Sequence, residues 1–418
     1  MLIHSAAQLL TPSAQPQRGS RMGELSIIPN GAVLIEGETI AAVGESADLL
    51  RRYPNEERYD ASGHAVLPGF VDPHTHLVWA SDRAAEFEMR LEGKTYMEIM
   101  TAGGGIQSTV NATRSASTAE LIAQTARRAQ DIFALGTTTA EAKSGYGLEW
   151  TSELKQMEVL LELDRQGPLE IQPTFLAAHA IPSGFGDRPD AYVQQICAQM
   201  LPELKNWWER HASKRPLPFV DVFCEKGAFS LEQTRLIFTT AQELGFPLKV
   251  HADEFENIGG ARLAIEMGAV SADHLVKTSP EEVRLFGSSS TAAVALPLTP
   301  FGLNELEYTP AKAIIAANGL LALASDLNPG TAWCGNMQFV IALACRAMHL
   351  TPAQAITAAT INAAAAIQRE EQLGSIHPGK QADLLVLRVD DYRHLAYRFG
   401  GNLVKDIFKK GRLYQNPC

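Results

Sequence analysis

Short apolar runs alternate with longer amphipathic stretches from residue 67 onward. Such alternation is typical of repeated strand and helix units that build a parallel sheet. The runs predicted to be strands are 67–71, 137–143, 171–176, 220–223, 248–251, 269–274, 292–296 and 320–325. Eight parallel strands favour an α/β fold of the (β/α)8 TIM-like barrel type.

The segments between these runs carry helix signals. Residues 117–135 have apolar positions at helical spacing, and Ser117 with Glu120 matches a capping box. Gly136 stands where a helix C-cap glycine is expected. An open, doubly wound sheet is the competing architecture, but no Gly-x-Gly-x-x-Gly turn follows the first run. A barrel is therefore the favoured fold.

The two chain ends follow a different pattern, because their short strand-like runs are separated by polar turns. The clearest of these runs are 31–36, 39–44, 382–387 and 404–408. We predict that residues 1–66 and 375–418 form one small β-sandwich domain, and that residues 67–374 form the barrel.

Composition and charge narrow the class of ligand. A chain of 418 residues accommodates a barrel of roughly 250 residues or more together with a small domain. A net charge of -11 disfavours nucleic acid and anionic membranes as partners, because both bind basic surfaces. Residues 1–10 lack the features of a signal peptide, and no segment has the length and apolarity of a membrane span. We therefore expect a cytoplasmic protein that binds a small molecule.

Polar residues at the ends of several predicted strands are the candidate chemistry, since barrel active sites lie at the C-terminal strand ends. His74 and His76 follow the first strand, and alternation along an extended chain turns both imidazoles to the same side. His251 ends the fifth strand and Asp326 follows the eighth. We predict that these four residues bind one divalent metal ion.

Each of these residues taken singly also fits a structural role, such as a hydrogen-bonded histidine or an aspartate that caps a turn. Their joint occurrence at several strand ends favours the metal site. Three neutral imidazoles and one carboxylate suit Zn²⁺ or Fe²⁺, with a coordination position left for water. His274 and Glu254 follow two neighbouring strands and are candidates for proton transfer.

The sequence resembles known families at these same motifs. Residues 67–76, Leu-Pro-Gly-Phe-Val-Asp-Pro-His-Thr-His, are similar to the opening signature of the amidohydrolase superfamily. The chain from about residue 67 to its end is similar to the imidazolonepropionase family, and the motifs that carry this resemblance are 103–106, 143–148, 178–182, 251–254, 271–275 and 326–330.

This resemblance implies an enzyme of histidine degradation that hydrolyses the cyclic amide of 4-imidazolone-5-propanoate to N-formimidoyl-L-glutamate. It implies that Asp326 holds the metal and accepts the proton of water, and that Glu254 and His274 move protons at the substrate. How these proton-transfer roles are divided stays open. In many superfamily relatives the residue corresponding to His274 is itself a metal ligand, so its role here rests on the narrower resemblance.

The resemblance also implies a set of substrate contacts and a homodimer. A guanidinium matches a carboxylate with two hydrogen bonds, so Arg83 is expected to bind the substrate's propionate. The other expected substrate-binding residues are Tyr146, His179, Glu254, Asn328, Gly330 and Thr331. Residues 296–303 depart from the family pattern, and their effect on substrate choice is not predicted.

Two alternatives remain open at this point. A deaminase of a cyclic amidine would use the same metal but release ammonia. A non-catalytic barrel scaffold is a second alternative, and the intact set of four predicted ligands argues against it. Binuclear relatives place a carboxylated lysine at the end of the fourth strand, where this chain has Cys224 and Glu225. One metal ion is therefore favoured, although Glu225 and Lys226 leave a second possible.

Overall fold

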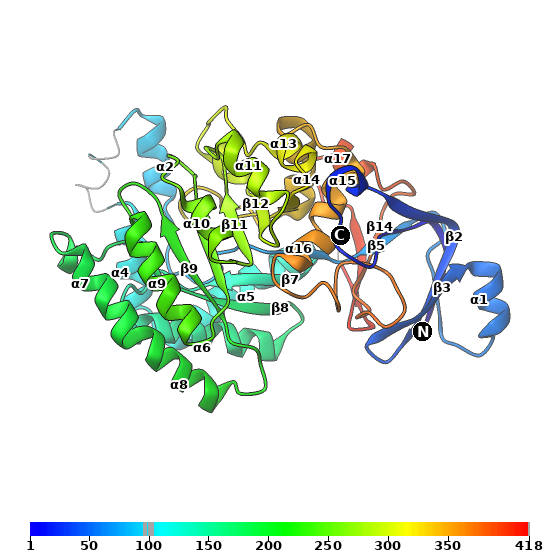
Figure 1. The fold of residues 1–418 in the computed structure, drawn as a ribbon. Helices are drawn as coiled ribbons and strands as arrows, with labels where there is room; N and C mark the ends of the chain where they lie inside the picture. Colours follow the sequence, from blue (N-terminus) through cyan, green and yellow to red (C-terminus); the bar gives the residue numbers. More distant parts are fainter. Residues whose placement is uncertain (95–97, 99–103, 417–418) are drawn as a thin grey trace.

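The computed structural model of the chain describes residues 1–94, 98 and 104–416. Its strands form two sheets, a parallel barrel and a second sheet built from both chain ends (Figure 1). We call the second one the terminal sheet, which comprises β1 to β5 and β14 to β16. In Figure 1 it lies beside the barrel, with α1 (Ser46–Arg52) at its outer side.

The barrel contains eight parallel strands within the described part of the chain, in the sequential order β6 to β13. Their bounds are Phe70–Asp72, Thr137–Lys143, Glu170–Ala178, Phe219–Cys224, Leu248–Ala252, Ser271–His274, Ala292–Ala295 and Leu320–Leu323. The first and last strands meet just beyond their ends, where a parallel bridge joins Thr75 to Leu327. His76 N donates to Leu327 O at 2.9 Å and Asp326 N donates to His74 O at 3.1 Å. The barrel therefore closes at the predicted metal ligands.

The predicted strands overlap the observed ones, but the first prediction, 67–71, is wrong in detail. Its beginning belongs to β5 (Ala65–Pro68), which pairs with β1 and β14 in the terminal sheet, and only its end belongs to β6. Between the two strands, Gly69 donates its N–H to Asp383 O and approaches Thr138 so closely that a β-carbon would overlap the hydroxyl. The apolar run is continuous because both sheets bury it.

Helices cover the outside of the barrel (Figure 1). The principal ones are α4 (Ile106–Ser115), α5 (Thr118–Ala134), α6 (Trp150–Gln166), α7 (Pro189–Gln195), α8 (Leu201–His211), α9 (Leu231–Glu243), α10 (Gly260–Glu266), α11 (Pro280–Phe286), α13 (Ala311–Ala316) and α14 (Met337–Ala347). The expected capping box of α5 is present, because Glu120 N donates to Ser117 Oγ and Ser117 N donates to the Glu120 carboxylate.

Shorter helices complete the connections. They are α2 (Ala84–Leu91), α12 (Leu298–Gly302), α15 (Pro352–Ala358), α16 (Ile361–Ala365), α17 (His394–Tyr397), two short 3-10 turns at Gly19–Arg21 and Ser183–Phe185, and a π-helical turn at Ile196–Met200. No helix in the described ranges is long and apolar enough to cross a membrane.

The terminal sheet joins the two ends of the chain. The remaining strands are β1 (Leu2–Pro12), β2 (Leu25–Glu36), β3 (Thr39–Glu45), β4 (Arg58–Asp60), β14 (Leu384–Leu387), β15 (Val404–Lys409) and β16 (Arg412–Gln415). β5 pairs in parallel with β1 and antiparallel with β14, so it holds the N-terminal and C-terminal strands together. Buried Lys409 of β15 contacts Asp383, which precedes β14, and Glu170 of β8 at 2.7 and 2.9 Å, which ties the terminal sheet to the barrel.

Candidate metal centre and active site

Four polar atoms converge where the barrel closes. His74 and His76 follow β6, His251 lies in β10, and Asp326 follows β13. Asp326 Oδ1 lies 3.5 Å from Nε2 of both His74 and His76. His76 Nε2 lies 3.2 Å from His251 Nε2. All four residues are buried, with exposed fractions of 0 to 3%.

The hydrogen bonding of this cluster fits a cation. His74 Nε2 and Asp326 Oδ1 are buried without a hydrogen-bond partner in the described part of the protein. Buried polar atoms without a partner are costly, and a metal ion that binds these lone pairs removes that cost. Three imidazole nitrogens and one carboxylate oxygen are donors that Zn²⁺ and Fe²⁺ accept. The residues present therefore fit one divalent ion.

Two buried aspartates fix the orientation of the histidine rings. His74 Nδ1 lies 2.6 Å from Asp273 Oδ2, and His251 Nδ1 lies 3.1 Å from Asp221 Oδ1. If each Nδ1 carries the proton and donates it to its carboxylate, the lone pair of each Nε2 faces the cluster. The two aspartates therefore favour the tautomer of His74 and His251 that a metal ligand needs.

Buried lysines balance these two aspartates. Lys143 Nζ lies 2.8 Å from Asp221, and Lys249 Nζ lies 3.6 Å from Asp273. Burial lowers the pKa of Lys143, but the charges of Asp221 and Glu141 outweigh it and raise the pKa above its ordinary value. Burial raises the pKa of Asp221, but His251 and Lys143 outweigh it, so the net pKa is depressed. Asp221 is therefore ionised.

Burial also shifts the pKa values of the predicted ligands. It lowers the pKa values of His74 and His76 well below their ordinary range, with further lowering by Lys143 and His179 respectively, so both imidazoles are neutral. Burial raises the pKa of Asp326 to about 6, against a lowering by the hydrogen bond from Thr299. Neutral imidazoles are the form that binds a metal.

The segment after strand seven, residues 296–303, contacts a predicted ligand. Its residues form α12, and Thr299 Oγ1 donates to Asp326 Oδ2 at 2.5 Å. This hydrogen bond leaves Asp326 Oδ1 toward the histidines. Asp326 itself has φ of 54°, an uncommon left-handed conformation that the surrounding contacts hold.

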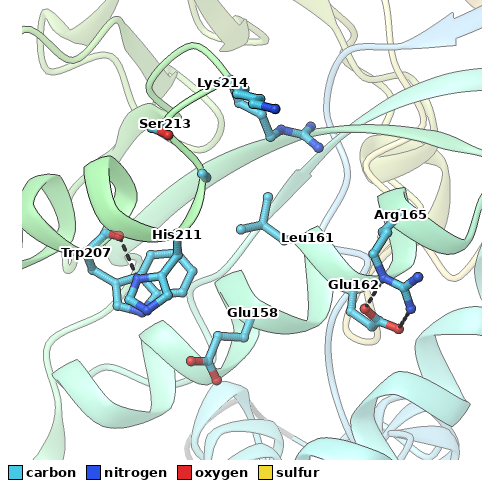
Figure 2. Close-up of a pocket in the computed structure, with 10 residues that line it drawn as sticks. Glu158, Leu161, Glu162, Arg165, Trp207, His211, Ser213 and Lys214 are labelled. Atoms are coloured by element: carbon cyan, nitrogen blue, oxygen red, sulfur yellow. Dashed lines mark hydrogen bonds and ion pairs between the residues drawn. The ribbon is translucent and has the colours of Figure 1, made fainter.

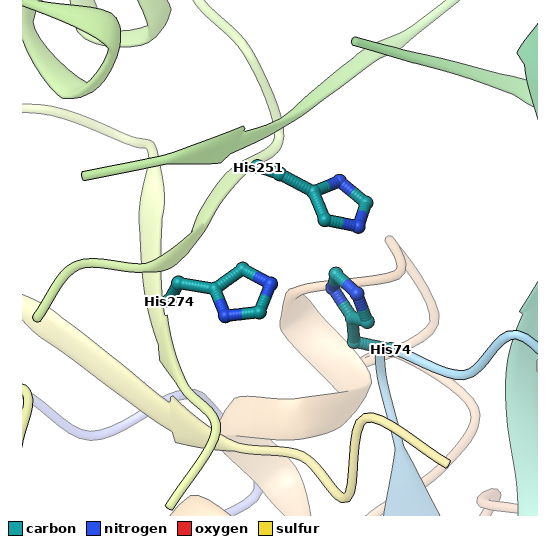
Figure 3. A group of neighbouring side chains, drawn as sticks. All are labelled: His74, His251 and His274. Atoms are coloured by element: carbon teal, nitrogen blue, oxygen red, sulfur yellow. The ribbon is translucent and has the colours of Figure 1, made fainter. Parts of the chain in front are cut away.

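His274 and Glu254 lie at the edge of the cluster. Nitrogens of His74, His251 and His274 lie within 4.8 Å of one another, and Figure 3 shows the three rings turned toward a common space. His274 Nε2 lies 3.6 Å from Glu254 Oε2. Burial, followed by the negative charges of Asp326 and Glu225, raises the pKa of Glu254 well above its ordinary range. The geometry accommodates His274 as a proton carrier or as a further ligand.

A cavity of about 150 Å³ opens over the cluster and collects the expected substrate-binding residues. Its lining is His76, Arg83, Ile106, Tyr146, His179, Phe223, His251, Glu254, Phe255, His274, Asp326, Asn328, Gly330 and Thr331. His74 is fully buried beneath it. The structure therefore brings all the predicted site residues into one place, from loops that follow different strands.

Arg83 is held at the rim of this cavity by Glu86. Arg83 Nε donates to Glu86 Oε2 at 2.9 Å, Arg83 Nη2 donates to Glu86 Oε1, and Gly105 N donates to Glu86 Oε2 at 2.7 Å. A β-carbon on Gly330 would overlap Arg83 Nη1, so the absent side chain leaves room for the guanidinium. Gly103 of the same family motif lies outside the described residues.

The other wall residues are fixed by local contacts. His179 stacks on His76 with ring centroids 4.8 Å apart, and its Nδ1 lies 3.0 Å from Gly145 O. Burial, followed by the charge of His251, lowers the pKa of His179 to about 3, so its ring is neutral. Asn328 Oδ1 accepts the N–H groups of Gly330 and Thr331 at 2.7 and 2.9 Å, which shapes the turn after strand eight.

Several residues with a direct role in this geometry were not predicted. Asp221 and Asp273 could have been recognised from sequence, since each places a charged residue within a predicted buried strand. Glu86 and Thr299 could not have been recognised from sequence, because their importance depends on contacts between separate loops.

A larger groove of about 520 Å³, between α6 and α8, contains Trp207 and none of the predicted site residues (Figure 2).

A barrel with histidines and an aspartate at its strand ends is typical of metal-dependent hydrolases, and the comparison with known families supports this class. The chain matches the model of the amidohydrolase family over residues 65–414, so it belongs to that metal-dependent family. It also resembles an adenosine deaminase from Xanthomonas campestris solved with bound zinc, with a TM-score of 0.70 at 19% identity, covering 99% of this chain and 93% of the other. At that identity the likeness describes the fold alone.

Relatives with higher sequence identity show which family within the amidohydrolases the chain belongs to. The chain is 47% identical to an imidazolonepropionase from Herpetosiphon aurantiacus, covering 99% of this chain and 96% of the relative. It is 46% identical to an imidazolonepropionase from Chloroflexus aggregans, covering 99% and 98%. Residues 31–55 also match the imidazolonepropionase-like composite domain of bacteria. The chain therefore belongs to the imidazolonepropionase family.

Proposed function

We propose that the protein hydrolyses the ring amide of 4-imidazolone-5-propanoate to N-formimidoyl-L-glutamate. Membership of the imidazolonepropionase family supports a hydrolase of carbon–nitrogen bonds in histidine degradation. The observation that carries the proposal is one cavity whose floor is the histidine and aspartate cluster and whose rim holds the Arg83 guanidinium. Such a cavity joins a hydrolytic centre to a binding site for a carboxylate.

The reaction adds water across one carbon–nitrogen bond. A divalent ion held by His74, His76, His251 and Asp326 would lower the pKa of water and supply hydroxide near neutral pH. The new carbon–oxygen bond forms at the ring carbonyl, the ring carbon–nitrogen bond breaks, and the departing nitrogen takes a proton.

The chain supplies groups for both proton movements. Asp326 takes the proton of the attacking water at its carboxylate, and Glu254 with His274 delivers a proton to the leaving nitrogen. Glu254 suits a donor because burial, followed by the charges of Asp326 and Glu225, raises its pKa and so favours the protonated carboxyl group. The Glu254 Oε2 to His274 Nε2 distance of 3.6 Å lets the pair share that task after a small movement.

The remaining cavity residues orient the substrate. Arg83 binds the propionate with its free N–H groups while Glu86 holds the other side of the guanidinium. The substrate ring is enclosed by the cavity wall, which restricts its orientation. The wall residues are Tyr146, His179, Asn328, Gly330 and Thr331. A small ring with one carboxylate fits a cavity that has the Arg83 guanidinium at its rim and the carboxyl groups of Glu254 and Asp326 near its floor.

We extend the proposal to the metal and the cellular setting. The donor set favours one Zn²⁺ or Fe²⁺ ion per chain. The strand pattern supports two domains, with residues 1–66 and 375–418 in one and 67–374 in the other. The family resemblance supports a homodimer, and the sequence features described above support a cytoplasmic location.

Product analysis tests the proposed reaction. Purified protein incubated with the substrate should produce formimidoylglutamate in an amount equal to the substrate consumed, without ammonia. Asp326→Ala and Glu254→Gln should each lose most of this activity, whereas Asp390→Asn at an exposed position should keep it. Release of ammonia in place of ring opening would contradict the proposal and identify a deaminase.

A further inference from the structure

The buried carboxylate of Glu225 has no part in the reaction proposed above. Glu225 follows β9, the fourth barrel strand, and is 3% exposed. Its position is the one at which a second metal remained possible from the sequence. The structure instead surrounds this carboxylate with backbone N–H groups.

Three N–H groups donate to Glu225. Phe255 N donates to Oε2 at 3.0 Å, while Glu256 N and Lys226 N donate to Oε1 at 3.2 and 2.9 Å. Both carboxylate oxygens are therefore engaged. Among the described residues, two groups of side chains are close enough to hold a metal ion, and Glu225 is in neither. They are His74 with His251 and His274, and His74 with His76 and Asp326. The carboxylate acts as a receptor for a loop rather than as a ligand.

The loop it receives carries Glu254. Phe255 and Glu256 are the two residues that follow Glu254, so two of the three hydrogen bonds hold the chain directly after the proposed proton donor. On the other side, Asp253 O accepts Lys277 N at 2.8 Å and Asp253 Oδ2 accepts Thr278 Oγ1 at 2.7 Å. Glu254 is thus fixed from both sides through its neighbours.

The turn that presents Glu225 is itself closed. Glu225 N donates to Phe229 O at 3.2 Å, and Ala228 N donates to Glu225 O at 3.0 Å. These bonds make residues 225–229 a compact support at the end of β9. Hydrogen bonds to an ionised acceptor are stronger than those between neutral groups, so a buried carboxylate suits this support.

We propose that Glu225 is a positioning residue that holds Glu254 in its place over the metal cluster through the backbone amides of Phe255 and Glu256. This inference rests on the proposed role of Glu254 in proton transfer. A displacement of a catalytic group by about 1 Å can lower a rate on the order of 100-fold, so the support of this loop affects turnover.

The matched test compares Glu225→Gln with Glu256→Gln. The first change replaces one of the two accepting oxygens by an NH₂ group that faces an N–H donor. The second changes a side chain in the same loop whose partner is Lys226 at the surface, with 52% of the Glu256 side chain exposed. Glu225→Gln should lower kcat roughly 10- to 100-fold with KM within about twofold and unchanged metal content, and Glu256→Gln should behave as wild type.

Two further variants separate positioning from loss of folding. Glu225→Asp keeps both accepting oxygens and should recover part of the lost kcat. In a Glu254→Gln background, Glu225→Gln should have little further effect, because the group it positions is already removed. An equal fractional loss in both backgrounds, or a loss of bound metal, would overturn the proposal.

Hydrogen exchange measures the loop without reference to any substrate. Amides of residues 253–258 should exchange at least about tenfold faster in Glu225→Gln than in wild type, with the Glu256→Gln loop unchanged. Unchanged exchange in the Glu225 variant would refute the support itself. If the wild-type protein fails to hydrolyse the substrate while the loop exchange responds as expected, the proposed reaction is wrong and the loop support stands.

Discussion

Among individual residues, the geometry of the candidate metal site depends on paired groups as well as on the four predicted ligands. Each of His74 and His251 has an aspartate at Nδ1, and each aspartate has a buried lysine near it. Thr299 orients Asp326 in a similar way, because its hydroxyl donates to the carboxylate oxygen that faces away from the histidines. These contacts orient His74, His251 and Asp326 toward the common space of the cluster.

Asp273→Asn tests this orientation. An amide in place of the carboxylate weakens the hydrogen bond that selects the His74 tautomer, so we expect metal affinity to fall roughly 10- to 100-fold. Competition with a chelator measures the affinity directly, and Asp390→Asn, at an exposed position, is the control. Equal affinities in the Asp273 variant and the control would contradict this role.

Gly330→Ala tests the space beside Arg83. The added methyl group would overlap Arg83 Nη1 and displace the guanidinium from the cavity. If Arg83 binds the substrate's carboxylate in the ground state and the transition state alike, KM should rise at least about tenfold with a smaller change in kcat. Gly401→Ala, where a β-carbon meets no atom within 4 Å, should leave KM unchanged. A normal KM in the Gly330 variant would place the carboxylate elsewhere.

The candidate metal ligands could be predicted from sequence because residues at the C-terminal ends of barrel strands lie on the same face of the barrel. His74, His76, His251 and Asp326 each follow or end an apolar run, which is a local signal. Glu225, Glu86 and Thr299 act through contacts between loops that are distant in sequence, and no local pattern reports those contacts. Sequence also could not divide the roles of His274, since its ring lies within reach of both the cluster and Glu254.

At the scale of elements, strands were predictable where one sheet buries the whole run. The run 137–143 corresponds to β7, which is buried throughout. The run 67–71 failed because two sheets share it, and apolar character cannot tell which sheet a residue joins. The crossing at Gly69 depends on the approach of Thr138, a contact that only the folded barrel creates.

The capping box of α5 gives a prediction for this scale. Ser117→Ala removes the acceptor for Glu120 N, and exposed caps of this kind contribute ~1 kcal/mol. The midpoint of thermal unfolding should fall by a few degrees or less in so large a protein, with metal affinity and kcat unchanged. Ser213→Ala, outside any helix cap, is the comparison. An altered kcat would mean that α5 affects the site directly.

At the scale of the whole molecule, the terminal sheet and the barrel share buried charges. Lys380 Nζ donates to the carbonyls of Ala14, Glu370 and Leu373 at 2.7, 2.6 and 3.3 Å. These carbonyls belong to the segment after β1 and to the chain after α16, so one side chain links both ends of the protein. Burial lowers the pKa of Lys380 to about 8.

This lowered pKa predicts a pH dependence of stability. Between pH 8 and 10.5 the folded protein has released a proton that the unfolded chain still binds, so the free energy of unfolding rises with pH over that range. Lys380→Met lacks this titration. The difference in thermal midpoint, wild type minus variant, should therefore be larger at pH 9.5 than at pH 7.5, and a constant or smaller difference would contradict the assignment.

A metal titration with product detection tests whether hydrolysis depends on one metal ion where the barrel closes. Metal-stripped protein should produce no formimidoylglutamate from 4-imidazolone-5-propanoate. Activity should return in proportion to added Zn²⁺ or Fe²⁺ and reach its maximum at about one ion per chain. Full turnover in the stripped protein would show that the reaction does not need the metal.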